Sequence, residues 1–206
     1  MTYGIVILSY FIGSIPFAYI LIRLYAKQDI RTIGSGNVGA MNSYETTGKK
    51  WIGFAVFFLD MLKGLAVVLL ARLLTNNDFL SVVVAALTTV IGHNYSVFLK
   101  FKGGRGLSTA VGMALLTVPF AIVFWGIFWL IGIYIIKKDL VISNVIALIC
   151  TPVAFYLLPD KIISSTTLLN IHNFLFIKLV VLILCVILFL AHIEPLKLLL
   201  SKKGDA

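Results

Sequence analysis

Long apolar runs limit what this chain can fold into more than any other feature. Several stretches of about 20 residues carry almost no charge, the length that an α-helix needs to cross roughly 30 Å of hydrocarbon. Of the 206 residues, 61% are hydrophobic and 12% are charged, whereas about 25% are charged in soluble domains. A soluble protein of this size could not bury so much apolar surface. We therefore predict an all-α integral membrane protein with a single polytopic domain over residues 1–206.

The apolar runs predict seven transmembrane helices, with approximate bounds Tyr3–Leu24, Trp51–Leu74, Phe79–Leu99, Leu107–Val118, Pro119–Ile136, Leu140–Leu158 and Phe174–Ile193. The run from Leu107 to Ile136 also fits one long tilted helix, which would give six. With seven spans and the N-terminus outside, thirteen of the 17 basic residues fall on the inner side, as the positive-inside rule requires. With six, Lys137 and Lys138 lie opposite the C-terminal basic cluster. Seven spans are therefore favoured, with Pro119 separating two short helices and a cytoplasmic C-terminus.

The excess of positive charge also needs an explanation, since 17 basic residues against 8 acidic ones give a net charge of +9. An excess of basic over acidic residues often indicates a nucleic-acid partner. Here the basic residues are scattered between the spans and form no stripe. Orientation in a lipid bilayer explains them, and no nucleic-acid partner is predicted.

The longest polar passage, Asp29–Lys50, carries the first candidate site. Within nine positions it places glycine, serine and asparagine residues at Gly34, Ser35, Gly36, Asn37, Gly39 and Asn42. Glycine reaches φ > 0 and lets backbone N–H groups come close to a ligand. Consecutive free N–H groups bind anions, and a following helix start adds its positive dipole end. We predict that this first glycine segment (Gly34–Asn42) binds a phosphate at the membrane surface.

A second polar stretch combines glycines with two cations. This second glycine segment (Phe101–Gly106) reads FKGGRG and carries Lys102 and Arg105. An arginine can hold a phosphate through two parallel hydrogen bonds, whereas a lysine acts as a point charge. The alternative is a basic loop that anchors to anionic lipid, worth ~1 kcal/mol per cation. Its glycines favour phosphate binding, because they contribute nothing to lipid anchoring.

Four ionisable side chains near or within the spans could also take part. His192 closes the last span close to Glu194, where an imidazole could act as a base or bind phosphate. In the seven-span topology it shares the cytoplasmic side with both glycine segments. His93, at the end of the third span, could bond the helix end or bind a ligand. Asp60 and Lys63 are three residues apart, on one helix face, and form either a structural ion pair or part of a site.

Several catalytic patterns are missing from the sequence. The residues Gly34–Gly39 match GxGxxG, but no βαβ unit surrounds them, so dinucleotide binding is not predicted. There is no GxSxG elbow, P-loop or HExxH pattern, and no His is followed five positions later by Asp. His93, His172 and His192 lack metal-ligand spacing, so neither a metal nor another cofactor is predicted. Any reaction must therefore depend on positioning and charge stabilisation of an already activated substrate.

Seven blocks in the same order resemble the bacterial acyl-phosphate:glycerol-3-phosphate acyltransferases: Gly13–Phe17, Gly34–Asn42, Gly48–Lys50, Phe57–Gly64, Gly92–His93, Phe98–Gly106 and His192–Glu194. The resemblance implies a seven-span protein of the bacterial cell membrane, with its N-terminus outside and its active site on the cytoplasmic side. It also implies transfer of a fatty acyl group from acyl phosphate to position 1 of glycerol 3-phosphate. The implied products are lysophosphatidic acid and phosphate, neither acyl-CoA nor acyl carrier protein is expected as donor, and no cofactor is expected.

The resemblance also implies roles for individual residues. Ser35 and His192 are expected to be catalytic. The expected substrate-binding residues are Gly34, Gly36, Asn37, Gly39, Asn42, His93, Lys102, Gly103, Gly104, Arg105, Ser143 and Glu194. Of these, Ser143 matches the family's serine motif only with a shift.

Some motif positions depart from the family pattern. Glu45 stands where an arginine is usual, and Arg105 replaces a lysine. Pro195 and Leu198 replace an asparagine and an arginine in the last motif. These changes leave open a second hypothesis, a catalytically impaired paralogue that binds a phosphorylated metabolite or lipid. A transporter is a third hypothesis, which the lack of an internal repeat does not support.

Overall fold

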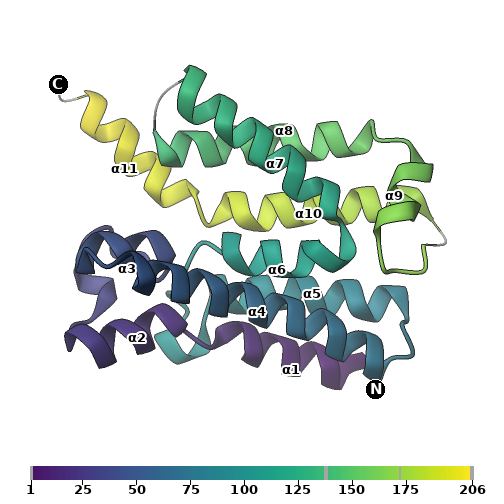
Figure 1. The fold of residues 1–206 in the computed structure, drawn as a ribbon, viewed down its shortest axis with the longest axis horizontal. Coiled ribbons are helices and arrows are strands. Elements are labelled where there is room, and N and C mark those ends of the chain that lie inside the picture. The colour runs from purple at the N-terminus through teal and green to yellow at the C-terminus, as the bar shows by residue number, and fades with distance from the viewer. Residues whose placement is uncertain (1, 137–138, 172, 205–206) are drawn as a thin grey trace. The chain divides into compact units, whose positions relative to one another are not determined.

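The computed structural model describes residues 2–136, 139–171 and 173–204, and every regular element in these ranges is a helix (Figure 1). The predicted all-α fold is therefore confirmed. The chain divides into two compact units, Met1–Met113 and Ala114–Ala206. The predicted single domain over residues 1–206 stays a prediction. Lys137, Lys138 and His172, which entered the prediction of topology and metal binding, lie outside the described residues.

The first unit contains both glycine segments. Its elements are α1 (Thr2–Ser14), α2 (Phe17–Ala26), the 3-10 turn η1 (Ile30–Thr32), α3 (Ala40–Thr47), α4 (Lys50–Leu74), α5 (Phe79–Asn94) and the 3-10 turn η2 (Val97–Leu99). Helix α6 (Leu107–Thr117) begins in this unit and ends in the next.

The second unit continues with α7 (Pro119–Ile131), the π-helical turn η3 (Gly132–Ile136), α8 (Leu140–Tyr156), α9 (Asp160–Thr166), α10 (Phe174–Leu190) and α11 (Ile193–Gly204). Asp139 caps α8, because its side chain accepts hydrogen bonds from the N–H groups of Val141 and Ile142. Helices α7 and α10 both pack against α8.

Four helical stretches among the described residues are long and apolar enough to cross a membrane: Tyr3–Ala26, Lys50–Leu74, Phe79–Leu99 and Pro119–Ile136. The count rises to six if the sharply bent pairs α8–α9 and α10–α11 are each one span. Helix α6 has 11 residues and is only about 16 Å long, too short to cross by itself. The predicted seven crossings and the placement of the termini stay predictions.

Two proline breaks shape these helices, and the sequence predicted one of them. Helix α6 ends at Thr117 and α7 begins at Pro119, which confirms the predicted separation. The first predicted span is interrupted at Ile15 and Pro16, between α1 and α2. Because proline lacks an N–H group, the helix ladder cannot continue through Pro16. This break leaves the carbonyl of Ile15 available to a side chain from another helix.

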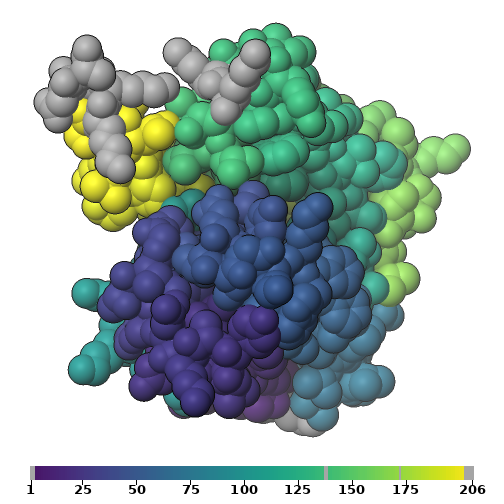
Figure 2. Space-filling view, turned by 60° about the vertical axis from the view of Figure 1, so that its left-hand side comes forward, coloured from purple at the N-terminus to yellow at the C-terminus, as the bar shows by residue number. Residues whose placement is uncertain are grey.

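A small apolar core anchors both glycine segments within the first unit. It joins Ile22 of α2 and Ile52 of α4 to Val38 of the first segment and to Leu99, which lies just before the second. All four side chains are buried. Figure 2 shows the purple and blue atoms of this unit as one closely packed surface. Burial of Val38 and Leu99 therefore fixes the two segments to the same scaffold.

Candidate active site

The first glycine segment is shaped by one buried amide. Asn42 is 1% exposed, and its Oδ1 atom accepts a hydrogen bond from the Ser35 N–H at 2.9 Å. Its Nδ2 group donates to the carbonyl oxygens of Ile30, Ile33 and Asn37 at 3.0–3.2 Å. A single side chain thus closes the loop. These hydrogen bonds give Asn42 a structural role. The substrate contact that was predicted for Asn42 stays a prediction.

Closure of this loop requires glycine at position 34. Gly34 has φ +57°, in the left-handed region, and a Cβ atom there would clash with Oδ1 of Asn42. The loop then leads directly into α3, whose first residue is Ala40. The predicted combination of a glycine loop and a following helix start is therefore present in the structure.

Several N–H groups of this segment donate no hydrogen bond within the described residues. They belong to Asn37, Val38, Ala40 and Met41, and the first ladder bond of α3 is donated by Ser43 to Gly39. The first N–H groups of a helix lack partners inside the helix and carry its positive dipole end. Ser35 is exposed, and its hydroxyl also makes no hydrogen bond with a described residue. This part of the loop can therefore receive an anion.

The second glycine segment is held against the end of α5. Gly103 and Gly104 donate their N–H groups to the carbonyl oxygens of Asn94 and His93, at 3.0 and 3.1 Å. Those two donors are therefore occupied by the fold, and a phosphate there would have to use other groups. The predicted phosphate contacts of Gly103 and Gly104 stay predictions.

The two glycine segments meet at Gly104. A Cβ atom on Gly104 would lie 2.5 Å from the carbonyl oxygen of Val38 and would clash with Nε2 of His93. No side chain larger than hydrogen fits between these groups. Residues about 65 positions apart in the sequence are in this way brought together at one place.

Arg105 and Lys102 supply the positive charge of the second segment. Lys102 is exposed, whereas Arg105 is partly buried and makes no hydrogen bond or close ion pair with a described residue. Burial lowers the pKa of the Arg105 guanidinium, and the carboxylate of Glu45 on α3 opposes that shift. The group remains charged at neutral pH, because arginine does not deprotonate in proteins. Arg105 thus offers a cation on which the carboxylate of Glu45 acts, and which no described residue holds by a hydrogen bond or a close ion pair.

An ion pair fixes the chain just before the first glycine segment. Nη2 of Arg31 lies 2.6 Å from Oδ2 of Asp29, and Nε of Arg31 donates to Oδ1 of Asp29 at 2.9 Å. The hydrogen bonds from Arg31 lower the pKa of the Asp29 carboxyl to about 2. The pair is therefore ionised at any physiological pH.

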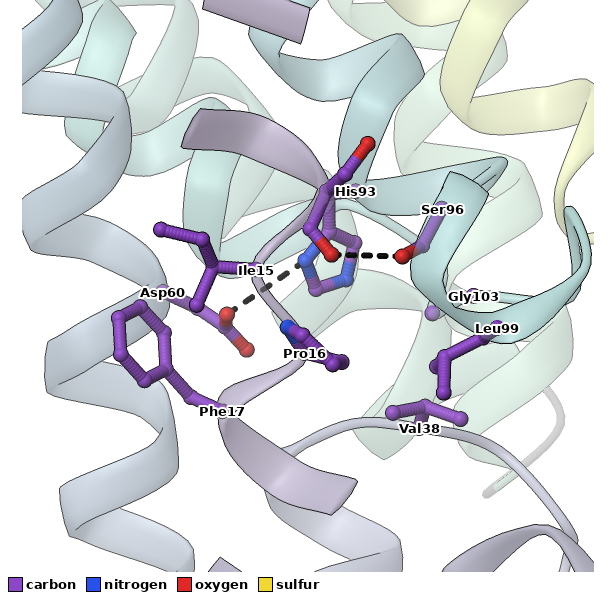
Figure 3. Close-up of a pocket in the computed structure, with 11 residues that line it drawn as sticks. Ile15, Pro16, Phe17, Val38, Asp60, His93, Ser96, Leu99 and Gly103 are labelled. Atoms are coloured by element: carbon purple, nitrogen blue, oxygen red, sulfur yellow. Dashed lines mark hydrogen bonds and ion pairs between the residues drawn. The ribbon is translucent and has the colours of Figure 1, made fainter. Parts of the chain in front are cut away.

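Asp60, Lys63 and His93 form a buried cluster beside the second segment. Figure 3 shows two of its members, Asp60 and His93, joined by a dashed line. Nζ of Lys63 lies 2.8 Å from Oδ1 of Asp60 and 2.9 Å from Nδ1 of His93. Of the two interpretations that the sequence left open for Asp60 and Lys63, the structural pair is thus observed. The contact with His93, 30 residues further along the chain, was not predicted. The substrate contact predicted for His93 stays a prediction.

The remaining predicted residues lie in the second unit. His192 is 0% exposed, at the turn between α10 and α11, and its Nδ1 atom is 2.8 Å from the carbonyl oxygen of Leu188. Ser143 is buried, and its hydroxyl donates to the carbonyl oxygen of Asp139 at 2.6 Å. Glu194 is exposed on α11. The predicted roles of these three residues stay predictions.

Replacement of Asn42 by alanine should disorganise the first glycine segment. The change removes the acceptor of the Ser35 N–H and the donors to three carbonyls, and each unmatched buried group costs about 1–3 kcal/mol. We expect faster limited proteolysis within residues 30–42 and at least a tenfold loss of any activity. Asn42→Asp keeps an acceptor for the Ser35 N–H but places a charged oxygen against the three carbonyls, so it should loosen the segment as well. Unchanged proteolysis in Asn42→Ala would show that the amide does not hold the loop.

Comparison with known proteins places the chain in a family. The family model described as "Glycerol-3-phosphate acyltransferase" matches residues 3–202. A glycerol-3-phosphate acyltransferase of Pelagibacter ubique is 35% identical over 204 residues, which cover 98% of this chain and 96% of that protein. Glycerol-3-phosphate acyltransferase 4 of Dehalococcoides mccartyi is 48% identical over 111 residues, which cover 54% of this chain and 47% of that protein.

Solved structures agree with this assignment. The crystal structure of PlsY (YgiH), an integral membrane glycerol 3-phosphate acyltransferase in its glycerol 3-phosphate form, matches with a TM-score of 0.76 and 32% identity. The match covers 98% of this chain and 92% of that one. The crystal structure of PlsY (YgiH) in its lysophosphatidic acid form matches this chain with the same TM-score and 29% identity. This chain is thus a multi-pass membrane protein that belongs to the glycerol-3-phosphate acyltransferase family.

Proposed function

We propose that this protein transfers a fatty acyl group from an acyl phosphate to the sn-1 hydroxyl of glycerol 3-phosphate, on the cytoplasmic side of a bacterial cell membrane. The hydroxyl oxygen attacks the acyl carbon, the bond from that carbon to the phosphate oxygen breaks, and an ester forms. The hydroxyl proton leaves with the phosphate, so that the products are lysophosphatidic acid and inorganic phosphate.

The observation that carries this proposal is the group of N–H donors in the first glycine segment that have no acceptor among the described residues. These N–H groups belong to Asn37, Val38, Ala40 and Met41, and the segment that contains them meets the segment that carries Arg105. Both substrates bear phosphate, which such donors and an arginine fork bind well. The relative solved in a glycerol 3-phosphate form and a lysophosphatidic acid form supports the same acceptor and product.

The chemistry itself asks little of the protein. An acyl phosphate is a mixed anhydride with a good leaving group, so no covalent enzyme intermediate is needed. Positioning of the two reactants and stabilisation of the developing negative charge supply the rate enhancement. We assign the exposed hydroxyl of Ser35 and the imidazole of His192 as catalytic groups, and Arg105 and Lys102 as phosphate ligands.

One feature favours a second function, phosphate binding without turnover. Glu45 is exposed on α3, three residues after Asn42, and its carboxylate interacts electrostatically with Arg105. A carboxylate there competes with a phosphate for the guanidinium. Such competition would weaken the stabilisation of negative charge that acyl transfer needs, while the N–H groups of the first glycine segment could still bind a phosphate.

An assay of the purified protein in detergent distinguishes acyl transfer from binding alone. The protein is supplied with palmitoyl phosphate and glycerol 3-phosphate. Acyl transfer predicts release of phosphate and lysophosphatidic acid in equal amounts, and no reaction with palmitoyl-CoA as donor. Protein that melts cooperatively and binds glycerol 3-phosphate without forming product would favour the binding function. If the Glu45→Arg variant then gains turnover, Glu45 is what impairs the enzyme.

Loss of either proposed catalytic group should slow the reaction. Ser35→Ala and His192→Ala should each lower kcat/KM at least ~tenfold, about 1.4 kcal/mol of transition-state stabilisation. The measurement is initial phosphate release at matched protein concentration, with the melting temperature of each variant as control. Wild-type rates in a variant would remove that residue from the mechanism.

A further inference from the structure

The buried cluster of Asp60, Lys63 and His93 has a geometry that determines where the proton of the imidazole ring lies. The three residues are 1%, 4% and 8% exposed. Nζ of Lys63 has three neighbouring acceptors: Oδ1 of Asp60 at 2.8 Å, Nδ1 of His93 at 2.9 Å and the carbonyl oxygen of Ile15 at 3.0 Å. An ammonium group has three N–H donors and no acceptor. Two of the contacts, to Nδ1 of His93 and to Ile15, are hydrogen bonds, and the contact with Asp60 is an ion pair.

The tautomer of His93 follows from this arrangement. Because the Lys63 ammonium cannot accept a hydrogen bond, Nδ1 of His93 must accept one and carries no proton. Asp60 lies further from Nδ1, at 3.5 Å, and its Oδ1 atom pairs with Lys63. The single proton of a neutral ring is then on Nε2, since the bond at one nitrogen sets the state of the other.

The Nε2 atom lies where the two glycine segments meet. A Cβ atom on Gly104 would clash with it and would also come within 2.5 Å of the carbonyl oxygen of Val38. In Figure 3 one ring nitrogen is turned toward Asp60, and Gly103 and Leu99 lie on the opposite side of the ring. No described residue accepts a hydrogen bond from Nε2.

The space beside the ring is small. A cavity of about 10 Å³ is lined by His93, Gly103, Gly104, Val38 and Ser96, among other residues. That volume is near the minimum for one water molecule. It can take a single oxygen atom of a larger group, whereas a whole glycerol phosphate cannot enter.

We propose that His93 donates its Nε2–H to one phosphate oxygen of a substrate held by the two glycine segments, a role which rests on the acyl transfer proposed above. Asp60 and Lys63 are positioning residues, which act through His93 by holding its ring in this tautomer. A neutral imidazole in a water-poor place can stabilise negative charge without taking up a proton. Gly104 leaves free the space beside Nε2 that a Cβ atom would fill.

Nitrogen-15 NMR of histidine-labelled protein in detergent tests the tautomer without any need for activity. The chain has 3 histidines, and the His93 signals are assigned by their loss in His93→Gln. We expect a protonated Nε2 and an unprotonated Nδ1 at neutral pH. In Lys63→Met, which lacks the donor to Nδ1, that nitrogen should gain a proton, because its nearest remaining partner is the carboxylate of Asp60 at 3.5 Å. A ring protonated on Nδ1, or on both nitrogens, in the wild-type protein would overturn the proposal, whether or not Lys63→Met folds.

Ligand additions then test the contact and identify which phosphate makes it. Glycerol 3-phosphate and a non-hydrolysable acyl phosphonate are added separately, with inorganic phosphate as the reference anion. A shift of the His93 Nε2 signal with only one of the two assigns the contact to the acceptor or to the donor. If neither ligand moves the signal at saturation, His93 does not touch phosphate.

Activity supplies a third readout. His93→Gln retains a side-chain N–H donor and should keep kcat within about tenfold of wild type. In His93→Leu, which has no donor, kcat should fall at least about a hundredfold. Equal activity in the two variants would contradict a donor role, provided that their melting temperatures agree. Should the wild-type protein show no turnover, acyl transfer fails, and the NMR results still decide the tautomer and the phosphate contact.

Discussion

Replacement of Lys63 by methionine should destabilise the folded protein by about 3–5 kcal/mol, the largest stability effect expected for a single change here. Asp60 is 1% exposed and has its ion-pair partner 2.8 Å away. Without Lys63 its carboxylate stays in a water-poor interior and loses the ammonium that compensates its charge, which is costly even though the imidazole of His93 lies 3.5 Å away. The carbonyl oxygen of Ile15 also loses its donor. Equilibrium unfolding in mixed micelles measures the difference.

The matched control removes both charges at once. Asp60→Leu combined with Lys63→Met should recover most of the loss, because apolar side chains of similar volume often replace a buried ion pair without a stability penalty. The double variant should nevertheless stay slow in acyl transfer, since the tautomer of His93 is no longer fixed. A Lys63→Met protein as stable as wild type would mean that the cluster does not contribute to the fold.

Replacement of Arg105 by glutamine should lower kcat/KM at least about a hundredfold, which corresponds to about 2.7 kcal/mol. Arg105 is partly buried beside the junction of the two glycine segments and forms no hydrogen bond or close ion pair with a described residue. Its guanidinium is therefore available to a phosphate, and glutamine has neither its charge nor its paired donors. Initial rates over a range of glycerol 3-phosphate and palmitoyl phosphate concentrations give the effect.

The control is Arg105→Lys, which keeps the positive charge but lacks the paired donors of the guanidinium. We expect the kcat/KM of this variant to stay within about tenfold of wild type. Stability should change little in both variants, because Arg105 supports no other described side chain by a hydrogen bond. Wild-type kinetics in Arg105→Gln would exclude Arg105 as a phosphate ligand.

The sequence predicted the helices better than it predicted their ends. Apolar runs located the long helices, and Pro119 indicated the break between α6 and α7 correctly. The break at Pro16 was missed, because a single proline hardly weakens the hydropathy of a run that is apolar on both sides. For α3 the sequence indicated only that a helix start follows the loop and gave no bounds, because its eight residues AMNSYETT are mostly polar and show no strong apolar period.

For the candidate site, sequence reasoning found the segments but not how they are held together. Spacing within one helix was enough to place Asp60 beside Lys63. Nothing in the sequence could place His93 on the same ammonium, because that contact depends on how α4 and α5 pack. Gly104 illustrates a second limit. A glycine near a cation suggests room for a ligand, whereas here it also allows the backbone to approach Val38 and His93.

The central claim is that the two glycine segments of the first unit seat a substrate phosphate, and a structure determined with bound glycerol 3-phosphate tests it most directly. We predict a phosphate within about 3.2 Å of N–H groups among Asn37, Val38, Ala40 and Met41, with the Arg105 guanidinium as a further ligand. A phosphate bound by residues of the second unit alone, with these N–H groups facing no ligand, would contradict the account.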